Sequence, residues 1–272
     1  MSTLKQNIKT LLPPLLLDFY KKVNTKYGYF GDYNNWQAAQ KYTTSFEDNA
    51  ILDKIKDSIN KFLNGQAVFE RDSIIYEEPQ YSWQLLTTLL YIAAQKENIN
   101  ILDFGGSLGS TYFTHKKFLP KNISYNWSVV ELEKFVVYGK KYFEDSQLKF
   151  YLNIDEAMNH NSFDIIALSG VICYLDKPYQ FLEHLINKKF EYIFIDRTLF
   201  FESNDRITIQ KVHPSIYNAN NSCWVFNKKK MADFFEKDYE IIEFFKICTP
   251  AVNIYQPFDI AQEHGLILKR KN

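Results

Sequence analysis

A short apolar segment that runs directly into a glycine-rich turn constrains this chain more than any other feature. The segment Ile101-Leu102-Asp103-Phe104 has the character of a buried strand, and Gly105-Gly106-Ser107-Leu108-Gly109 follows it. Glycines at 105, 106 and 109 permit a tight strand-to-helix turn in which a ligand approaches bare backbone and the amides of the next helix. The pattern therefore predicts an α/β fold with a nucleotide-like cofactor at the turn.

The residue types around the turn indicate which cofactor binds there. A dinucleotide fingerprint would place glycines at 104, 106 and 109, but position 104 is Phe and Asp103 stands just before the turn. A carboxylate beside a pyrophosphate would oppose the attraction that a helix N-terminus offers to anions. S-adenosylmethionine (SAM) has no phosphate and carries an ammonium and a sulfonium, so the turn favours SAM over a dinucleotide.

Composition excludes several classes of protein. The 272 residues contain 32 Lys plus Arg and 32 Asp plus Glu, so the chain has no net positive charge that would indicate nucleic-acid binding. The cysteines Cys173, Cys223 and Cys248 form no C-x-x-C pair, which favours neither a disulfide framework nor a zinc site. A reducing cytoplasm is the predicted compartment, and no metal site is predicted.

The N-terminus contains an apolar stretch, Leu11-Leu12-Pro13-Pro14-Leu15-Leu16-Leu17. It is much shorter than the roughly 20 apolar residues of a membrane span and contains two prolines. We expect it to pack on the protein body within an N-terminal helical layer rather than to serve as an anchor or a secretion signal. Weak attachment to an anionic membrane surface through flanking lysines is the alternative.

The hydrophobic pattern changes near residue 98. Residues 1–97 are predicted to form an N-terminal helical layer or lid, with its clearest helices at 50–63 and 83–95. Residues 98–272 alternate between strand and helix, which predicts a Rossmann-like, mostly parallel sheet with helices on both faces. Strands are expected at 99–104, 126–131, 148–153, 163–169, 190–196, 239–247 and 265–269, and helices after 109 and 133 and at 177–187 and 228–236. The last strand is expected to be antiparallel.

A long, irregular stretch from 197 to 226 follows the predicted strand 190–196. It leaves the carboxyl end of a parallel strand, where open α/β sheets bind their ligands. We therefore expect residues 197–226 to form a substrate loop.

Taken together, the Asp-x-Gly-Gly-x-x-Gly motif and the seven predicted strands resemble the Rossmann-like (class I) SAM-dependent methyltransferases. A closer resemblance is to a family of methyltransferases found among bacterial surface-polysaccharide genes, and it covers roughly residues 25 to 270. The matching residues are Trp36, Phe69-Glu70-Arg71-Asp72-Ser73, Leu102 to Gly109, Ile195-Asp196-Arg197-Thr198, Gln210 to Tyr217 and Trp224. Leu199 stands where that family would have a proline. The resemblance implies methyl transfer to a sugar or a phosphorylated precursor of capsule or lipopolysaccharide.

Acids and small residues at strand ends are the other candidate cofactor contacts. Glu131 ends the second predicted strand, where a carboxylate can accept hydrogen bonds from both ribose hydroxyls; Glu133 is the second choice for this role. The alternative is that Glu131 only caps the helix that follows. Asp155 is placed near the adenine amino group, or else caps a helix. Ser169 and Gly170, after the fourth strand, are expected to border the adenosine and the methyl group.

Methyl transfer from a sulfonium requires mainly that the acceptor be held in line, with a base assisting a hydroxyl. His213 lies in the stretch beyond the fifth strand, with Tyr217 close by, and an imidazole suits a general base near neutral pH. Asp196 could orient an acceptor hydroxyl and Arg197 could clamp a phosphate or carboxylate, or the two could form an internal ion pair.

Two questions remain open at the level of sequence. The pair Arg71-Asp72 is expected either to cover the cofactor as part of a lid or to form a salt bridge to the sheet. The principal alternatives to a methyltransferase are an oxidoreductase that uses a nicotinamide cofactor, which Asp103 and Phe104 disfavour, and a catalytically degenerate partner protein with the same fold. The predicted substrate is a small molecule, with no nucleic-acid partner and no membrane insertion.

Overall fold

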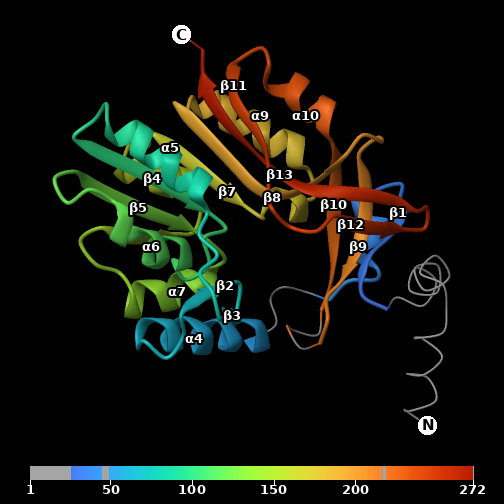
Figure 1. Cartoon of the computed structure of the whole chain (residues 1–272), viewed down its shortest axis with the longest axis horizontal. Coiled ribbons are helices and arrows are strands. Elements are labelled where there is room, and N and C mark those ends of the chain that lie inside the picture. The colour runs from blue at the N-terminus through green and yellow to red at the C-terminus, as the bar shows by residue number, and fades with distance from the viewer. Residues whose placement is uncertain (1–25, 45–48, 215, 217–218, 272) are drawn as a thin grey trace.

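The computed structural model describes residues 26–44, 49–214, 216 and 219–271 (Figure 1). The apolar segment at 11–17 and the candidate Tyr217 lie outside these residues. None of the helices in the described part of the chain is long and apolar enough to cross a membrane.

Seven strands form the α/β part of the molecule, in the order β6–β5–β4–β7–β8–β13–β11. Five of them are parallel: β4 (Asn98–Phe104), β5 (Ser124–Val130), β6 (Leu148–Tyr151), β7 (Ile165–Ser169) and β8 (Tyr192–Phe201). The last strand, β13 (Asp259–Arg270), runs antiparallel to both β8 and β11 (Tyr239–Lys246). The α/β fold and the antiparallel last strand are thus confirmed.

The prediction of a mostly parallel sheet needs correction, because the same sheet continues into a closed barrel of six strands. The barrel runs β13–β12–β1–β9–β10–β8 and back to β13, through β1 (Gly28–Tyr33), β9 (Arg206–Lys211), β10 (Asn220–Asn227) and β12 (Val252–Tyr255). Strands β8 and β13, with 10 and 12 residues, are long enough to belong to both parts. The result is a mixed sheet rather than a mostly parallel one.

Two sequence-based expectations change with the barrel. The stretch 197–226 contains the end of β8, all of β9 and most of β10, so it is not an irregular loop. The segment 1–97 is not purely helical, since β1 joins the barrel and the hairpin β2 (Phe69–Arg71) and β3 (Ile74–Tyr76) forms a small sheet of its own. The helices expected at 50–63 and 83–95 are present as α4 (Asn49–Leu63) and α5 (Trp83–Ala93).

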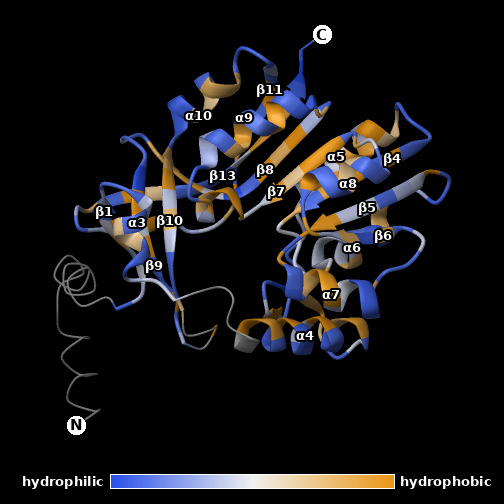
Figure 2. Cartoon of the chain, turned by 180° about the vertical axis from the view of Figure 1, so that it is seen from behind, coloured by the Kyte–Doolittle hydropathy of each residue, from blue (hydrophilic) through white to orange (hydrophobic). Residues whose placement is uncertain are grey.

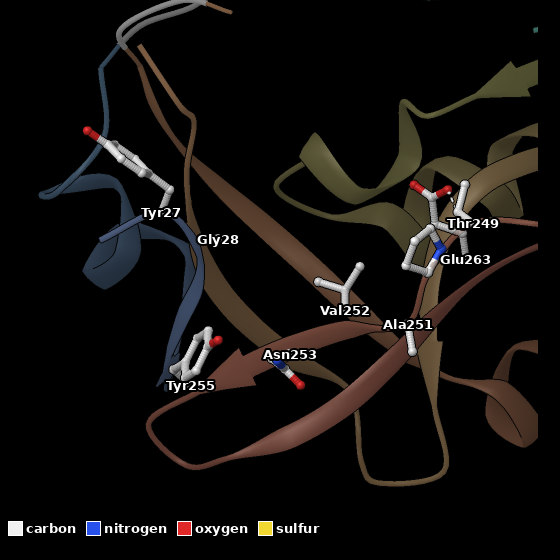
Figure 3. Close-up of a pocket in the computed structure, with 9 residues that line it drawn as sticks. Tyr27, Gly28, Thr249, Ala251, Val252, Asn253, Tyr255 and Glu263 are labelled. Atoms are coloured by element: carbon white, nitrogen blue, oxygen red, sulfur yellow. Dashed lines mark hydrogen bonds between the residues drawn. The ribbon is translucent and has the colours of Figure 1, made fainter. Parts of the chain in front are cut away.

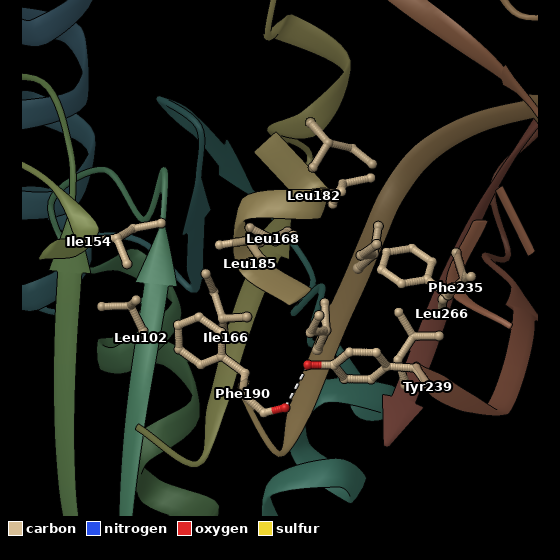
Figure 4. Packing of buried hydrophobic residues seen from close by; sticks show 14 of the residues in the cluster. Leu102, Ile154, Ile166, Leu168, Leu182, Leu185, Phe190, Phe235, Tyr239 and Leu266 are labelled. Atoms are coloured by element: carbon tan, nitrogen blue, oxygen red, sulfur yellow. Dashed lines mark hydrogen bonds between the residues drawn. The ribbon is translucent and has the colours of Figure 1, made fainter. Parts of the chain in front are cut away.

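Helices cover both faces of the seven-strand part, as predicted. Helices α5, α6 (Ser110–His115) and α7 (Glu133–Tyr142) share one core with the strands. Helices α8 (Ile154–His160), α9 (Pro178–Lys188) and α10 (Lys228–Phe235) share the other, where Leu182, Leu185 and Phe235 gather against the sheet (Figure 4). Residues 165–168 of β7 and 193–195 of β8 between them are apolar (Figure 2), because both faces of these strands are covered.

Strand order reverses direction next to β4. The chain builds outward from β4 to β5 and β6 on one side, and then to β7 and β8 on the other. Such a reversal leaves a crevice at the carboxyl ends of β4 and β7, where doubly wound sheets bind ligands. Helix α4 packs close by, since its buried face contacts Leu108 of the glycine turn and Phe135 of α7.

Candidate functional site

The glycine turn after β4 has a geometry that larger residues would not fit. Gly105 has a φ of +75°, and a Cβ added there would lie 2.7 Å from a side-chain carbon of Val171, in the loop after β7. A Cβ on Gly106 would lie 2.6 Å from the carboxyl carbon of Asp103. Gly109, with a φ of +85°, occupies the N-cap position of α6. The backbone of the turn therefore packs closely against both the loop after β7 and the side chain of Asp103.

Asp103 lies beneath this turn and is 2% exposed. Its Oδ2 accepts a hydrogen bond from Nε1 of Trp127 at 3.1 Å. Burial raises the pKa of Asp103 to about 7, although the bond from Trp127 and the charge of Arg197 both act to lower it. The structure thus gives Asp103 a role in supporting the turn; its direct contact with a cofactor stays a prediction.

Glu131 follows β5 and lies beside the turn. Its Oε2 accepts a hydrogen bond from the backbone N–H of Leu132 at 2.6 Å. Burial raises the pKa of Glu131, against the backbone N–H groups of Leu132 and Ser107. The N-cap residue of α7 is Leu132, which makes no side-chain capping bond. Glu131 comes one position earlier and is therefore not the N-cap residue of this helix. The Oγ of Ser107 is buried and has no hydrogen-bond partner among the described residues.

A set of polar side chains, here called the polar cluster, lies where β7 ends beside the middle of β8. It consists of Asp72, Ser82, Ser169, Asp196 and Arg197. Asp196 is 3% exposed and accepts hydrogen bonds from the hydroxyls of Ser82, at 2.9 Å, and Ser169. Arg197 donates from Nε to the hydroxyl of Ser169 and from a terminal nitrogen to its carbonyl, each at 3.1 Å, and forms an ion pair with Asp72.

The backbone of the polar cluster is held in unusual conformations. Asp72 and Arg197 have φ values of +53° and +50°, a region that residues other than glycine rarely adopt. The guanidinium of Arg197 lies over Gly170, where an added Cβ would come within 3.3 Å of Cζ. Such conformations persist only where the surroundings over-determine them, and they concentrate at ligand sites.

The hairpin β2–β3 is anchored by Glu70, a residue that the sequence pattern did not single out. Glu70 is 1% exposed and accepts hydrogen bonds from the hydroxyl of Ser110 at 2.6 Å, and from the hydroxyl of Ser58 and the N–H of Ser73, each at 3.1 Å. Burial raises the pKa of Glu70. An acid within the resembling segment 69–73 was the available signal, but nothing in the sequence indicated three donors from separate elements.

The salt bridge expected for Asp72 is present, since its carboxylate pairs with Arg197 of β8. Partial removal of the carboxylate from water acts to raise the pKa of Asp72. The charge of Arg197 outweighs this effect, and the pKa falls below its usual value. The ion pair still leaves room for a lid role, because it fastens the hairpin across the end of the sheet that carries the glycine turn.

We predict that Asp72→Ala lowers the free energy of unfolding by less than about 1 kcal/mol, because the side chain is half-exposed and such pairs contribute little. If the hairpin closes over a bound cofactor, the same change weakens S-adenosylhomocysteine (SAH) binding about tenfold or more. Urea unfolding and titration calorimetry measure the two quantities. Asp57→Ala, which breaks an exposed ion pair within α4, is the control; a variant that binds SAH like the parent would limit Asp72 to a structural role.

His115 of α6 supports the polar cluster indirectly through its contacts. Its Nε2 accepts the backbone N–H of Ser82 at 3.0 Å, and its Nδ1 lies 2.9 Å from the carbonyl oxygen of Thr111. Burial lowers the pKa of His115. A neutral ring protonated on Nδ1 satisfies both contacts, so His115 fixes the loop that presents Ser82 to Asp196.

Two predicted site residues, Asp155 and His213, have surroundings that differ from those of the glycine turn and the polar cluster. Asp155 lies in the first turn of α8, is largely exposed and forms an ion pair with Lys188, while Asn153 is the N-cap residue. The pKa of Asp155 is lowered by its hydrogen bond to Lys188. His213 is exposed just beyond β9, with its ring 4.6 Å from that of Tyr27. Their roles toward cofactor and acceptor stay predictions.

A cavity of about 430 Å³ opens at the barrel, between β1 and the strands β12 and β13. Tyr27 and Tyr255 lie on one side of it and Thr249 and Glu263 on the other, with Val252 pointing into the space between them (Figure 3). The glycine turn does not contribute to its lining. The barrel therefore offers a concave surface that is separate from the glycine turn.

No protein-family model matches the sequence, and no curated protein matches it. The fold is similar to solved structures of low sequence identity. The N-terminal domain of EvdMO1, crystallised in the presence of SAH and D-fucose, is 12% identical over 83% of this chain and 100% of that one, with a TM-score of 0.46. A SAM-dependent methyltransferase from Clostridium acetobutylicum is 11% identical, with coverages of 79% and 99% and a TM-score of 0.48. The glycopeptide N-methyltransferase MtfA is 8% identical, with coverages of 74% and 100% and a TM-score of 0.48. Function has to be inferred from the residues of the chain itself.

Proposed function

We propose that this protein is a SAM-dependent methyltransferase that methylates a hydroxyl oxygen of a sugar, or of a phosphorylated sugar precursor, for capsule or lipopolysaccharide synthesis. One observation carries the cofactor assignment. The glycine turn lies at the point where strand order reverses, and carboxylates gather around it: Asp103 below, Glu131 beside it, and Asp72 and Asp196 in the polar cluster. This surface suits a cationic nucleoside better than a pyrophosphate.

The residues of the turn fit such a cofactor. Glu131 stands at the end of the strand next to β4, where a carboxylate can accept both ribose hydroxyls. Ser107 offers a buried hydroxyl that no described residue satisfies. Ser169 and Gly170 end the strand on the other side of β4 and would border the methyl group. Asp103, once ionised, would favour a positively charged ligand over a neutral one.

Bound SAM supplies an electrophilic methyl group on its sulfonium. The contribution of the protein is then to hold an acceptor hydroxyl in line with it. Arg197, fixed by Ser169 and Asp72, presents a cation beside the carboxyl end of β7 that would orient a negatively charged or polar acceptor group. His213 is the proposed base for the hydroxyl proton.

Titration calorimetry with SAM, SAH and NAD tests the proposal. SAM and SAH are expected to bind and NAD is not. We predict that Glu131→Ala weakens SAH binding by about 1 to 3 kcal/mol, because a charge-assisted hydrogen bond to the ribose is lost. Glu133→Ala separates the two choices for this role: if Glu131 holds the ribose, this variant of an exposed acid in the first turn of α7 should bind SAH like the parent. Binding of NAD alone, or equal affinity in parent and Glu131→Ala, would contradict the assignment.

A further inference from the structure

The barrel has an apolar middle layer. Leu199 of β8, Val225 of β10, Ile254 of β12 and Ala261 of β13 are buried together as one cluster. Side chains two residues apart on a strand point to the same face, so the residues two positions away on these strands also face inward. The inward-facing residues on either side of this apolar layer are of different kinds at the two ends of the barrel.

One end is closed by Arg206. It lies opposite Val225 in the pairing of β9 and β10 and is 8% exposed. Its guanidinium donates to the carbonyl of Pro257 at 3.0 Å, pairs with Asp259 at 3.3 Å and lies 5.3 Å from the ring centre of Phe201. These contacts fill that end, so a ligand would have to enter from the other.

The other end carries a polar row across three strands. The strand register aligns Tyr29 of β1, Gln210 of β9 and Asn221 of β10. Gln210 donates to the hydroxyl of Tyr29 at 2.9 Å and accepts from the hydroxyl of Tyr174 at 2.8 Å. Asn221 is 2% exposed and donates weakly to Gln210 at 3.5 Å, while its Oδ1 has no partner among the described residues. An unsatisfied buried amide oxygen is costly unless it serves a ligand.

Glu263 lies on the inner face of β13 at the end of the barrel away from Arg206, and it also lines the 430 Å³ cavity (Figure 3). It lies opposite Leu199 and accepts a hydrogen bond from the hydroxyl of Thr249 at 3.0 Å. Burial, the two cysteines Cys173 and Cys223, and the charge of Glu263 all raise the pKa of Tyr29. Leu199, the partner of Glu263, lies two residues beyond Arg197 on β8. This end of the barrel therefore adjoins the polar cluster.

We propose that the polar end of the barrel, formed by Tyr29, Gln210, Asn221 and Glu263, binds the neutral, hydroxyl-rich part of a saccharide acceptor. Sugar hydroxyls both donate and accept hydrogen bonds, and so can use a phenol, two amides and a carboxylate at once. A phosphate is an anion with mostly acceptor oxygens and would be repelled by the carboxylate of Glu263, so it is not the group that enters here. The role as an acceptor site rests on the proposed methyltransferase function; the saccharide binding does not.

The test is ligand-observed NMR with methyl α-D-glucoside, methyl α-D-galactoside, N-acetyl-D-glucosamine and D-fucose as probes, and inorganic phosphate as competitor. At least one sugar should bind the parent, and phosphate should not displace it. Asn221→Leu and Glu263→Gln should each weaken that binding about tenfold or more. The control Glu243→Gln, an exposed acid on β11, should leave it unchanged.

Folding and function are checked separately. Asn221→Leu should keep the melting temperature of the parent, because it removes a buried oxygen that has no partner among the described residues. Binding of none of the sugars by the parent, binding by both variants as tight as that of the parent, or displacement of the sugar by phosphate would overturn the proposal. If the parent binds sugar with this pattern but neither SAM nor SAH, the methyltransferase assignment fails and the saccharide site stands.

Discussion

Replacing Gly106 with valine is expected to abolish measurable SAM and SAH binding and to lower the free energy of unfolding by about 1 to 3 kcal/mol. The Cβ alone would lie 2.6 Å from the carboxyl carbon of Asp103 and 2.7 Å from its Oδ2, so either the turn or the carboxylate must move. The two additional methyl groups would occupy backbone surface that the cofactor is expected to approach. Calorimetry and urea unfolding measure the two losses.

A double-variant cycle assigns the effect to this contact. Gly106→Ala should destabilise the protein, and the same change in an Asp103→Ala background should cost less, because the clashing carboxylate is gone. Equal costs in both backgrounds would show that the contact between Gly106 and Asp103 does not limit the turn. SAH binding like that of the parent by Gly106→Val would remove the turn from the cofactor site.

The second large effect is a dependence of stability on pH that is due to Asp103. Its pKa is about 7 in the folded protein against an ordinary value of 3.8, because burial disfavours the charged form. A raised carboxyl pKa means that the folded state binds a proton more tightly, so stability falls as pH rises from about 4 to 7 and stays lower above 7. Each pH unit between the two pKa values contributes about 1.4 kcal/mol, so the total is on the order of 4 kcal/mol.

Asp103→Asn should remove this dependence. Relative to the parent, the variant should become more stable by up to about 4 kcal/mol between pH 4 and pH 8, whatever its constant cost at low pH. Urea unfolding of both proteins across this range gives the difference, with Asp53→Asn, an exposed acid on α4, as control. A difference between variant and parent that does not change with pH would show that Asp103 ionises freely in the folded protein.

Sequence was sufficient for the parts of the fold in which chain order and hydrophobic pattern agree. Strands β4, β5, β6, β7 and β11 and helices α9 and α10 begin and end within a few residues of their predicted bounds. Buried strands covered on both faces give continuous apolar runs, and helices between them give a clear change of period. The glycine turn could also be predicted from the sequence, because its motif is one contiguous stretch and the turn itself requires glycines.

The sequence pattern did not predict the barrel. Strand β9 alternates correctly, but Thr208 and Gln210 point into the barrel while Ile207 and Ile209 pack outside against Trp36, the reverse of the expected pattern. Strand β1 contains two glycines, and β12 is short. A pattern of polar residues inside and apolar residues outside is typical of a loop or an exposed strand until a second layer is known to cover it.

The sequence alone therefore determined the α/β class and the position of the glycine turn, because both depend on contacts between neighbours along the chain. The polar cluster and the polar end of the barrel needed the tertiary structure. Asp72 meets Arg197 across 125 positions, and Tyr29 meets Gln210 across 181. No local spacing encodes such pairs, because closure of the barrel and the crossing of the hairpin bring them together.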